Sequence, residues 1–260
     1  MSVVAKRREV ADALLVHARR VSDEGVVQAG CAFTDVPEAD AFLRSRPEAF
    51  LIGVLFTQGI PAERAWAGPW RLSQRLGHFD LERLALETDA VSRAVATPPA
   101  LHRFVKTLPK WISEAARRVV SEYGGDASAI WPHGATVAEV AERLRSFPGI
   151  GEKKAAMAVE LLVRHLGVRL TGLEDGCVAY DVHVRRVFLR SGLVDRDAPG
   201  AIRDAARFVK PEDPGSVDLA TWLIGRQFCR PTVPRCDACP LVSACPRLVW
   251  IRPEGVGVRR

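Results

Sequence analysis

The sequence has no apolar run long enough to cross a membrane. Its longest apolar stretches, residues 49–57 and 155–163, are nine residues each, whereas a transmembrane helix needs about 20. Basic residues at 6–8 are followed by Glu9 and Asp12 rather than by the uniform apolar segment of a secretory signal. We therefore expect a cytoplasmic protein with no membrane partner.

The sequence also lacks internal repeats, low-complexity tracts and long flexible linkers. Its 260 residues are 48% hydrophobic and 26% charged, a balance that excludes a wholly disordered chain and allows one large domain or two closely packed lobes. The formal net charge is +6 and the isoelectric point is about 9.2. This excess is typical of proteins that bind a polyanion such as nucleic acid, although dispersed surface arginines would produce the same balance.

Cysteines are few, but four of the six lie close together. Cys31 and Cys177 stand alone among small or apolar neighbours and fit ordinary buried cysteines. In a cytoplasmic chain the remaining compact group favours metal or redox chemistry over disulfides. The four follow a C-x6-C-x2-C-x5-C pattern formed by Cys229, Cys236, Cys239 and Cys245.

Four thiolates at this spacing can ligate an iron-sulfur cluster or a tetrahedral zinc ion. Most zinc ribbons pair two C-x2-C knuckles across a longer gap, and this segment has only one. The spacing therefore favours a cluster while leaving zinc as the alternative. The arginines around the ligands either face a DNA backbone or balance the charge of the bound group; they are Arg226, Arg230, Arg235 and Arg247.

Apolar residues recur at helical spacing along most of the chain, which predicts an all-α protein. Thr136 and Glu139 predict a capping box at the start of one helix. One short β-hairpin is expected between Gly167 and Tyr180, where apolar residues alternate. The predicted helices cover residues 4–21, 37–44, 47–58, 61–76, 80–87, 89–95, 99–106, 110–123, 136–146, 151–166, 182–191, 198–207 and 216–228.

A Pro-Gly-x-Gly turn at residues 148–151 separates two of these helices. Two glycines let backbone amides approach a phosphate closely, and the following helix start adds positive potential. Such a turn is either a plain connector or a phosphate-binding hairpin without sequence specificity.

Together these segments resemble the endonuclease III-like DNA glycosylases of the helix-hairpin-helix superfamily. The resemblance rests on the hairpin, the segment Val178-Ala-Tyr-Asp-Val-His-Val-Arg-Arg186 and the cysteine spacing, in that order along the chain. It implies a [4Fe-4S] cluster on the four cysteines and a two-lobed helical fold with DNA in the groove between the lobes. The implied helical barrel lobe covers residues 35–172, and the implied cluster lobe joins residues 1–34 to residues 173–260.

The resemblance also assigns the chemistry. Lys153 stands at the position of the family's nucleophilic lysine, which attacks the sugar and leads to strand cleavage by β-elimination. Asp181 matches the family's essential aspartate, and an aspartate before an apolar helix is also a good N-cap. The alternative for Lys153 is a phosphate contact, which would leave a glycosylase that uses water activated by Asp181.

The resemblance places further residues against DNA. Gly149, Ile150, Gly151 and Lys154 would contact a phosphate, and Gln58 would fill the gap left by a flipped base, although an isolated glutamine is usually plain surface. A base could also stack on a tryptophan, and we expect one or two of these to belong to the core: Trp66, Trp70, Trp111 and Trp131.

We therefore expect a monomeric, nucleoid-associated base-excision repair glycosylase with lyase activity that acts on double-stranded DNA containing a damaged base. Lys153 favours an oxidised pyrimidine and argues against an adenine glycosylase, whose additional oxoguanine-reading domain we do not expect here. Oxidised purines, alkylated bases and mismatched thymine stay open as substrates, as does a non-catalytic DNA-binding iron-sulfur protein. Lys153 and Asp181 are separated by 28 positions, a longer interval than the family pattern, which bears on the substrate more than on the fold.

Overall fold

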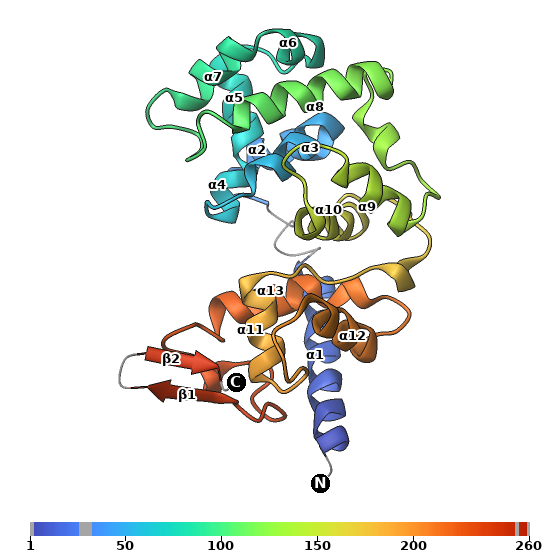
Figure 1. Cartoon of the computed structure of the whole chain (residues 1–260), viewed down its shortest axis with the longest axis vertical. Coiled ribbons are helices and arrows are strands. Elements are labelled where there is room, and N and C mark those ends of the chain that lie inside the picture. The colour runs from blue at the N-terminus through green and yellow to red at the C-terminus, as the bar shows by residue number, and fades with distance from the viewer. Residues whose placement is uncertain (1–2, 26–32, 253–254, 259–260) are drawn as a thin grey trace.

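The computed structural model describes residues 3–25, 33–252 and 255–258, and it is built from two helical lobes (Figure 1). The helices of the first lobe are α2 (Pro37–Ser45), α3 (Pro47–Phe56), α4 (Ala62–Trp66), α5 (Gly68–Leu76), α6 (Leu81–Leu86), α7 (Thr88–Ala96), α8 (Leu108–Glu122), α9 (Val137–Arg145) and α10 (Glu152–His165). The second lobe contains α1 (Val3–Gly25), α11 (Val182–Arg190), α12 (Pro199–Val209) and α13 (Asp218–Gln227). The predicted all-α fold class is confirmed. None of the helices in the described part of the chain combines the length and hydropathy that a membrane span needs.

Each lobe has its own apolar core. The first core draws on buried residues between Phe33 and Leu170 and surrounds α3, in which every residue from Ala49 to Phe56 is buried. The second core draws on residues 10–18 and 178–244, so α1 packs with helices from the other end of the chain (Figure 1). The chain therefore leaves the second lobe after α1 and returns to it after residue 170.

Local sequence signals explain where several helices begin. Proline occupies the first turn of α2, α3, α8 and α12, where a missing backbone N–H costs nothing. The predicted capping box is present, because the Glu139 N–H donates to Thr136 Oγ1 and the Thr136 N–H donates to Glu139 Oε2. Asp181 caps α11 by accepting the His183 N–H at 2.7 Å.

Two predicted helices are wrong in part or in full. The helix expected over residues 61–76 is divided into α4 and α5 at Ala67, because a proline at position 69 removes an N–H and crowds the carbonyl four residues earlier. The helix expected over residues 99–106 is absent, and this stretch consists of turns and bends. The Arg75 side chain donates to the Pro99 carbonyl at the start of this stretch and to the Thr97 carbonyl just before it.

The hairpin expected between Gly167 and Tyr180 is also wrong. Thr171 instead pairs in parallel with Thr136, just before α9, and a 3-10 turn (Leu173–Asp175) follows. This segment pairs with a distant part of the chain rather than with itself, and it occupies much of the long interval between Lys153 and Asp181. An unexpected antiparallel hairpin, β1 (Val249–Arg252) and β2 (Gly255–Val258), forms near the carboxyl end, with residue 249 opposite residue 258.

Candidate active site

The glycine-rich turn connects α9 to α10 as a tight hairpin. Gly149 has a φ of 83°, and a Cβ atom at this position would lie 2.5 Å from the ring of Trp111. Ile150 is buried and anchors the turn in the first core. Gly151 is exposed, and no atom lies within 4 Å of the place where its Cβ would be. The backbone conformation and the close packing of Trp111 therefore require glycine at position 149, whereas nothing in the protein covers the turn at Gly151.

Lys153 and Asp181 meet where the two lobes approach each other. Lys153 Nζ lies 2.6 Å from Asp181 Oδ2, and the exposed fractions of their side chains are 54% and 11%. Burial alone would raise the pKa of Asp181, but the hydrogen bonds from Lys153 and from the His183 backbone lower it below its ordinary value. The site therefore combines an accessible amine with a shielded carboxylate that stays ionised, the pair that proton transfer from a lysine nucleophile requires.

A second carboxylate lies near Asp181 and was not predicted from the sequence. Asp218, the first residue of α13, accepts the Ala179 N–H at 2.7 Å. Burial and the charge of Asp181 raise its pKa to about 7. Asp218 holds the backbone that leads into Asp181, and the only signal for it in the sequence was an acidic residue at the start of an apolar helix.

His183 and Arg186 connect the candidate site to the cysteine segment. Arg186 Nη2 lies 3.0 Å from His183 Nδ1 and donates to the Gly225 carbonyl at 2.7 Å. Arg186 Nε donates to the Cys229 carbonyl at 2.6 Å. The helix capped by Asp181 is thus fixed to the first of the four motif cysteines.

Lys154 is directed into the protein rather than outward. Its Nζ donates to the Leu55 carbonyl at 3.0 Å and lies 5.7 Å from the centre of the Trp111 ring. Burial and the neighbouring Lys153 lower the pKa of Lys154 to about 8. A direct contact between Lys154 and a phosphate would require this side chain to leave its site.

Gln58 lies exposed in the turn that follows α3. Of the four tryptophans considered as stacking candidates, Trp66 and Trp131 are buried in the first core, as expected. Trp70 and Trp111 are partly exposed, and Trp111 packs beneath the hairpin glycine. Of these residues, only Trp111 lies against the hairpin that carries Lys153.

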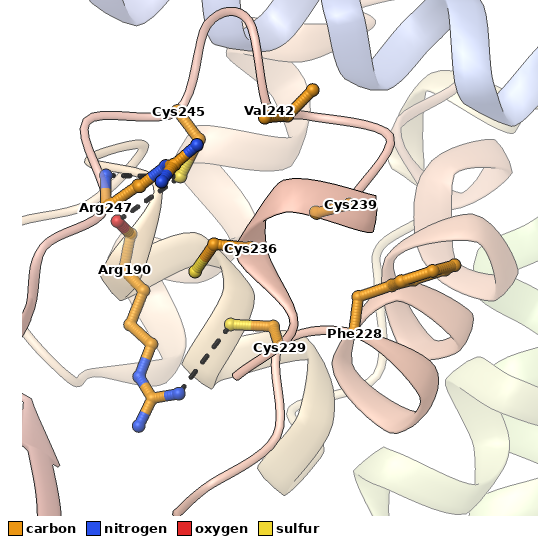
Figure 2. Close-up of a pocket in the computed structure, with 8 residues that line it drawn as sticks. All are labelled: Arg190, Phe228, Cys229, Cys236, Cys239, Val242, Cys245 and Arg247. Carbon is orange, nitrogen blue, oxygen red and sulfur yellow. Dashed lines mark hydrogen bonds between the residues drawn. The ribbon is translucent and has the colours of Figure 1, made fainter. Parts of the chain in front are cut away.

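The four motif cysteines line a single small cavity in the second lobe, together with Arg190, Phe228, Val242 and Arg247 (Figure 2). Burial raises the pKa of three of these thiols, and that of Cys239 reaches about 11. Such thiols ionise when a cation compensates the charge, so the donor set fits a thiolate-ligated metal centre. In the described residues no three metal-binding side chains converge tightly on one point.

Buried arginine stabilises the backbone around this cavity. Arg190 is 2% exposed and donates to the Arg230 and Pro231 carbonyls at 2.6 and 2.9 Å, and its Nη1 lies 3.8 Å from Cys229 Sγ. Two of the flanking arginines form ion pairs, Arg226 with Glu63 and Arg247 with Asp237. Of the two isolated cysteines, Cys177 is partly buried, and Cys31 lies outside the described residues.

Comparison with known proteins gives a consistent result. No protein-family model matches the chain. Endonuclease III of Thermotoga maritima is 28% identical over 186 residues, which are 67% of this chain and 78% of that protein. A solved thermostable thymine-DNA glycosylase superposes with a TM-score of 0.60 at 15% identity, covering 95% of this chain and 98% of its own.

A trapped endonuclease III–DNA covalent intermediate superposes with a TM-score of 0.52 at 18% identity, covering 81% of this chain and 92% of its own. The structural superpositions show which fold the chain has, and the sequence identity shows which proteins it resembles. The chain is therefore similar in sequence to endonuclease III, and it shares its fold with the solved endonuclease III–DNA intermediate and the thymine-DNA glycosylase.

Proposed function

We propose that the chain is a base-excision repair DNA glycosylase with lyase activity. The 2.6 Å contact between Lys153 and Asp181 carries this proposal, because it joins an accessible amine to a shielded carboxylate across the two lobes. Relatives named endonuclease III and a solved relative trapped covalently on DNA support the same chemistry.

The proposed reaction begins with a base flipped out of the duplex. Asp181 accepts a proton from Lys153, and the free amine attacks sugar C1′ while the glycosidic bond breaks. The base leaves with the bonding electrons and takes up a proton. The sugar ring then opens to a Schiff base on Lys153.

Strand cleavage follows from the Schiff base. Loss of a proton from C2′ expels the 3′ phosphate by β-elimination, and water then releases Lys153. Because Lys153 argues against an adenine glycosylase, we propose an oxidised pyrimidine as the leading substrate class, within double-stranded DNA bound by a monomer.

The hairpin supports the DNA-binding part of the proposal. Gly151 leaves the turn open to a phosphate, and the amino end of α10 adds positive potential there. Gly149 and Ile150 fix the turn from below, so the contact would come from backbone groups and carry no sequence specificity.

We also propose that Cys229, Cys236, Cys239 and Cys245 hold a [4Fe-4S] cluster. All four line one cavity, and four soft thiolates are the usual ligands of such clusters. When bound, the cluster would supply a rigid crosslink for residues 229–245. Equal amounts of iron and acid-labile sulfide, about four of each per chain, are expected in protein purified without oxygen. Zinc without sulfide would contradict this assignment.

Borohydride trapping tests the enzymatic proposal. Duplexes carrying oxidised pyrimidines, oxidised purines, alkylated bases or a thymine mismatch are mixed with protein and borohydride, which fixes a Schiff base covalently. We expect an adduct with an oxidised pyrimidine that disappears in Lys153→Ala and persists in Lys6→Met, a substitution of an exposed lysine on α1. Base release with breaks only after alkali would indicate an enzyme that uses water, and binding without base release from any lesion would remove the enzymatic proposal.

A further inference from the structure

The loop that carries Gln58, residues 57–61, is fixed at its first end by a lysine from the hairpin. The last carbonyls of a helix have no partners within the helix, and α3 ends at Phe56. The Val54 carbonyl accepts both the N–H and the Oγ1–H of Thr57. The next carbonyl, that of Leu55, accepts Lys154 Nζ at 3.0 Å. The residue that follows Lys153 therefore caps the helix that leads to Gln58.

The surroundings of Lys154 favour this placement. Its ammonium lies over Trp111, and Trp111 packs beneath Gly149 of the hairpin. A cation at the carboxyl end of a helix also interacts favourably with the helix dipole. The titratable groups nearby are Lys153 on the same helix and the buried His102, whose pKa is lowered by burial and by the charge of Lys154. One side chain thus connects the hairpin, α8 and the end of α3.

The other end of the loop is fixed to the second lobe. Helix α4 begins directly after the loop, and Glu63 Oε1 lies 2.5 Å from Arg226 Nη1 of α13. The Arg226 guanidinium lies 5.0 Å from the centre of the Trp222 ring, which packs against His183, two residues after Asp181. The contacts from Glu63 through Arg226 and Trp222 therefore connect the Gln58 loop to α11, the helix capped by Asp181.

We propose that Lys154 and the Glu63–Arg226 pair are positioning residues that set the place of the Gln58 loop relative to Lys153 and Asp181. The inference rests on the proposed function, because it assigns Gln58 to the gap left by a flipped base. Neither contact touches the reacting atoms. Their effect is on how fast the base is displaced and how well the displaced state is stabilised.

The experiment measures base displacement without chemistry. Full-length protein carrying Lys153→Ala is mixed with a duplex that holds 2-aminopurine beside a stable abasic analogue, and the rise in fluorescence reports unstacking. Gln58→Ala should abolish the rise. Lys154→Met and Glu63→Gln should each slow it about tenfold, the effect of losing one charge-assisted hydrogen bond. Lys154→Arg should restore it, and Lys6→Met is the matched control.

The pH dependence of the unstacking rate distinguishes a positioning role of Lys154 from a role in protein stability alone. In protein that keeps Lys153, mixed with the same unreactive abasic analogue, Lys154 loses its charge as the pH rises through about 8, so the rate of unstacking should fall between about pH 7 and pH 9. The Lys154→Arg protein should show a flat profile over the same range, because its guanidinium stays charged.

The outcomes separate this inference from the proposed function. An unchanged rate in Lys154→Met and Glu63→Gln, or a loss of thermal stability with unchanged unstacking, overturns the inference. An unchanged rate in Gln58→Ala overturns it as well. Failure of the otherwise unsubstituted protein to release any base from the lesion panel is a different result, since it removes the proposed function itself.

Discussion

Two adjacent lysines on α10 lie in very different surroundings. Lys153 is 54% exposed at its side chain and faces Asp181 across the lobes. Lys154 lies inside the first lobe against Leu55 and Trp111, with its pKa lowered to about 8. The direction of each side chain thus separates a candidate nucleophile from a structural cation. The sequence alone could not make this distinction, because the partner of Lys154 lies 99 positions earlier.

At the candidate site, Asp181→Asn should separate chemistry from folding. The substitution removes the proton acceptor for Lys153, and loss of such a group slows the reaction about 10²- to 10⁴-fold. Asparagine caps helices about as well as aspartate, so the melting temperature should change little. Single-turnover base release and thermal unfolding of the same protein measure both effects. A fast reaction in this variant would show that Asp181 only caps α11.

Among the elements, the hairpin between α9 and α10 offers a matched pair of glycines. Gly149→Ala places a side chain at a φ of 83° and against the Trp111 ring, which should lower the free energy of unfolding by about 2 kcal/mol or more. Gly151→Ala meets no atom within 4 Å, so stability should be unchanged.

DNA affinity should respond differently in the two variants. A methyl group on Gly151 would stand between the turn and a phosphate, so Gly151→Ala should weaken binding to undamaged duplex DNA while the protein stays fully stable. Denaturant unfolding and fluorescence anisotropy, measured on both variants, test this contrast. Full DNA affinity in Gly151→Ala would exclude the open face of the turn as a phosphate site.

Helix punctuation was the most predictable part of the structure. The capping box at Thr136 is set by residues within one turn of helix, and it is present as expected. The absent helix at 99–106 and the absent hairpin at 167–180 depended on partners far away, namely Arg75 and Thr136. Asp218 was missed for the same reason, since its role comes from the Ala179 N–H of another segment.

On the scale of the whole molecule, charged side chains join the two lobes. Helix α10 contributes three ion pairs to the second lobe, Lys153–Asp181, Glu152–Arg203 and Arg164–Asp213, and α4 contributes Glu63–Arg226. Beside them lies Glu160, which is 9% exposed and has its Oε2 atom 3.5 Å from Arg164 Nε. The contact between the lobes therefore contains many charged groups, of which the carboxyls of Asp181, Asp213 and Glu160 are buried.

This junction should make stability depend on pH. Burial raises the pKa of Glu160 from 4.5 to about 8, so between these values the folded protein keeps a proton that the unfolded chain releases. The contribution of Glu160 to stability is then greatest below about pH 4.5, and it falls as the pH rises to about 8. Asp218 contributes with the same sign up to about pH 7.

Thermal unfolding from pH 5 to pH 9 tests this expectation. Glu160→Gln should flatten much of the decline, because the amide has no proton to lose. Glu212→Gln, at an exposed position in the loop after α12, should leave the decline in melting temperature unchanged. A decline in Glu160→Gln as steep as that of the unsubstituted protein would contradict a protonated Glu160 in the folded protein.

The return of the chain to α1 has a consequence for how the protein is made. The first core is complete within one continuous stretch, from Phe33 to Leu170, so that lobe can fold while the rest is still being synthesised. The second core needs α1 together with residues up to Ala244. Helix α1 is translated before the whole first lobe, and its partners in the second core follow only after that lobe. The cysteine motif is translated with the last segments of this core, so insertion of the proposed cluster would coincide with the closing of the second lobe.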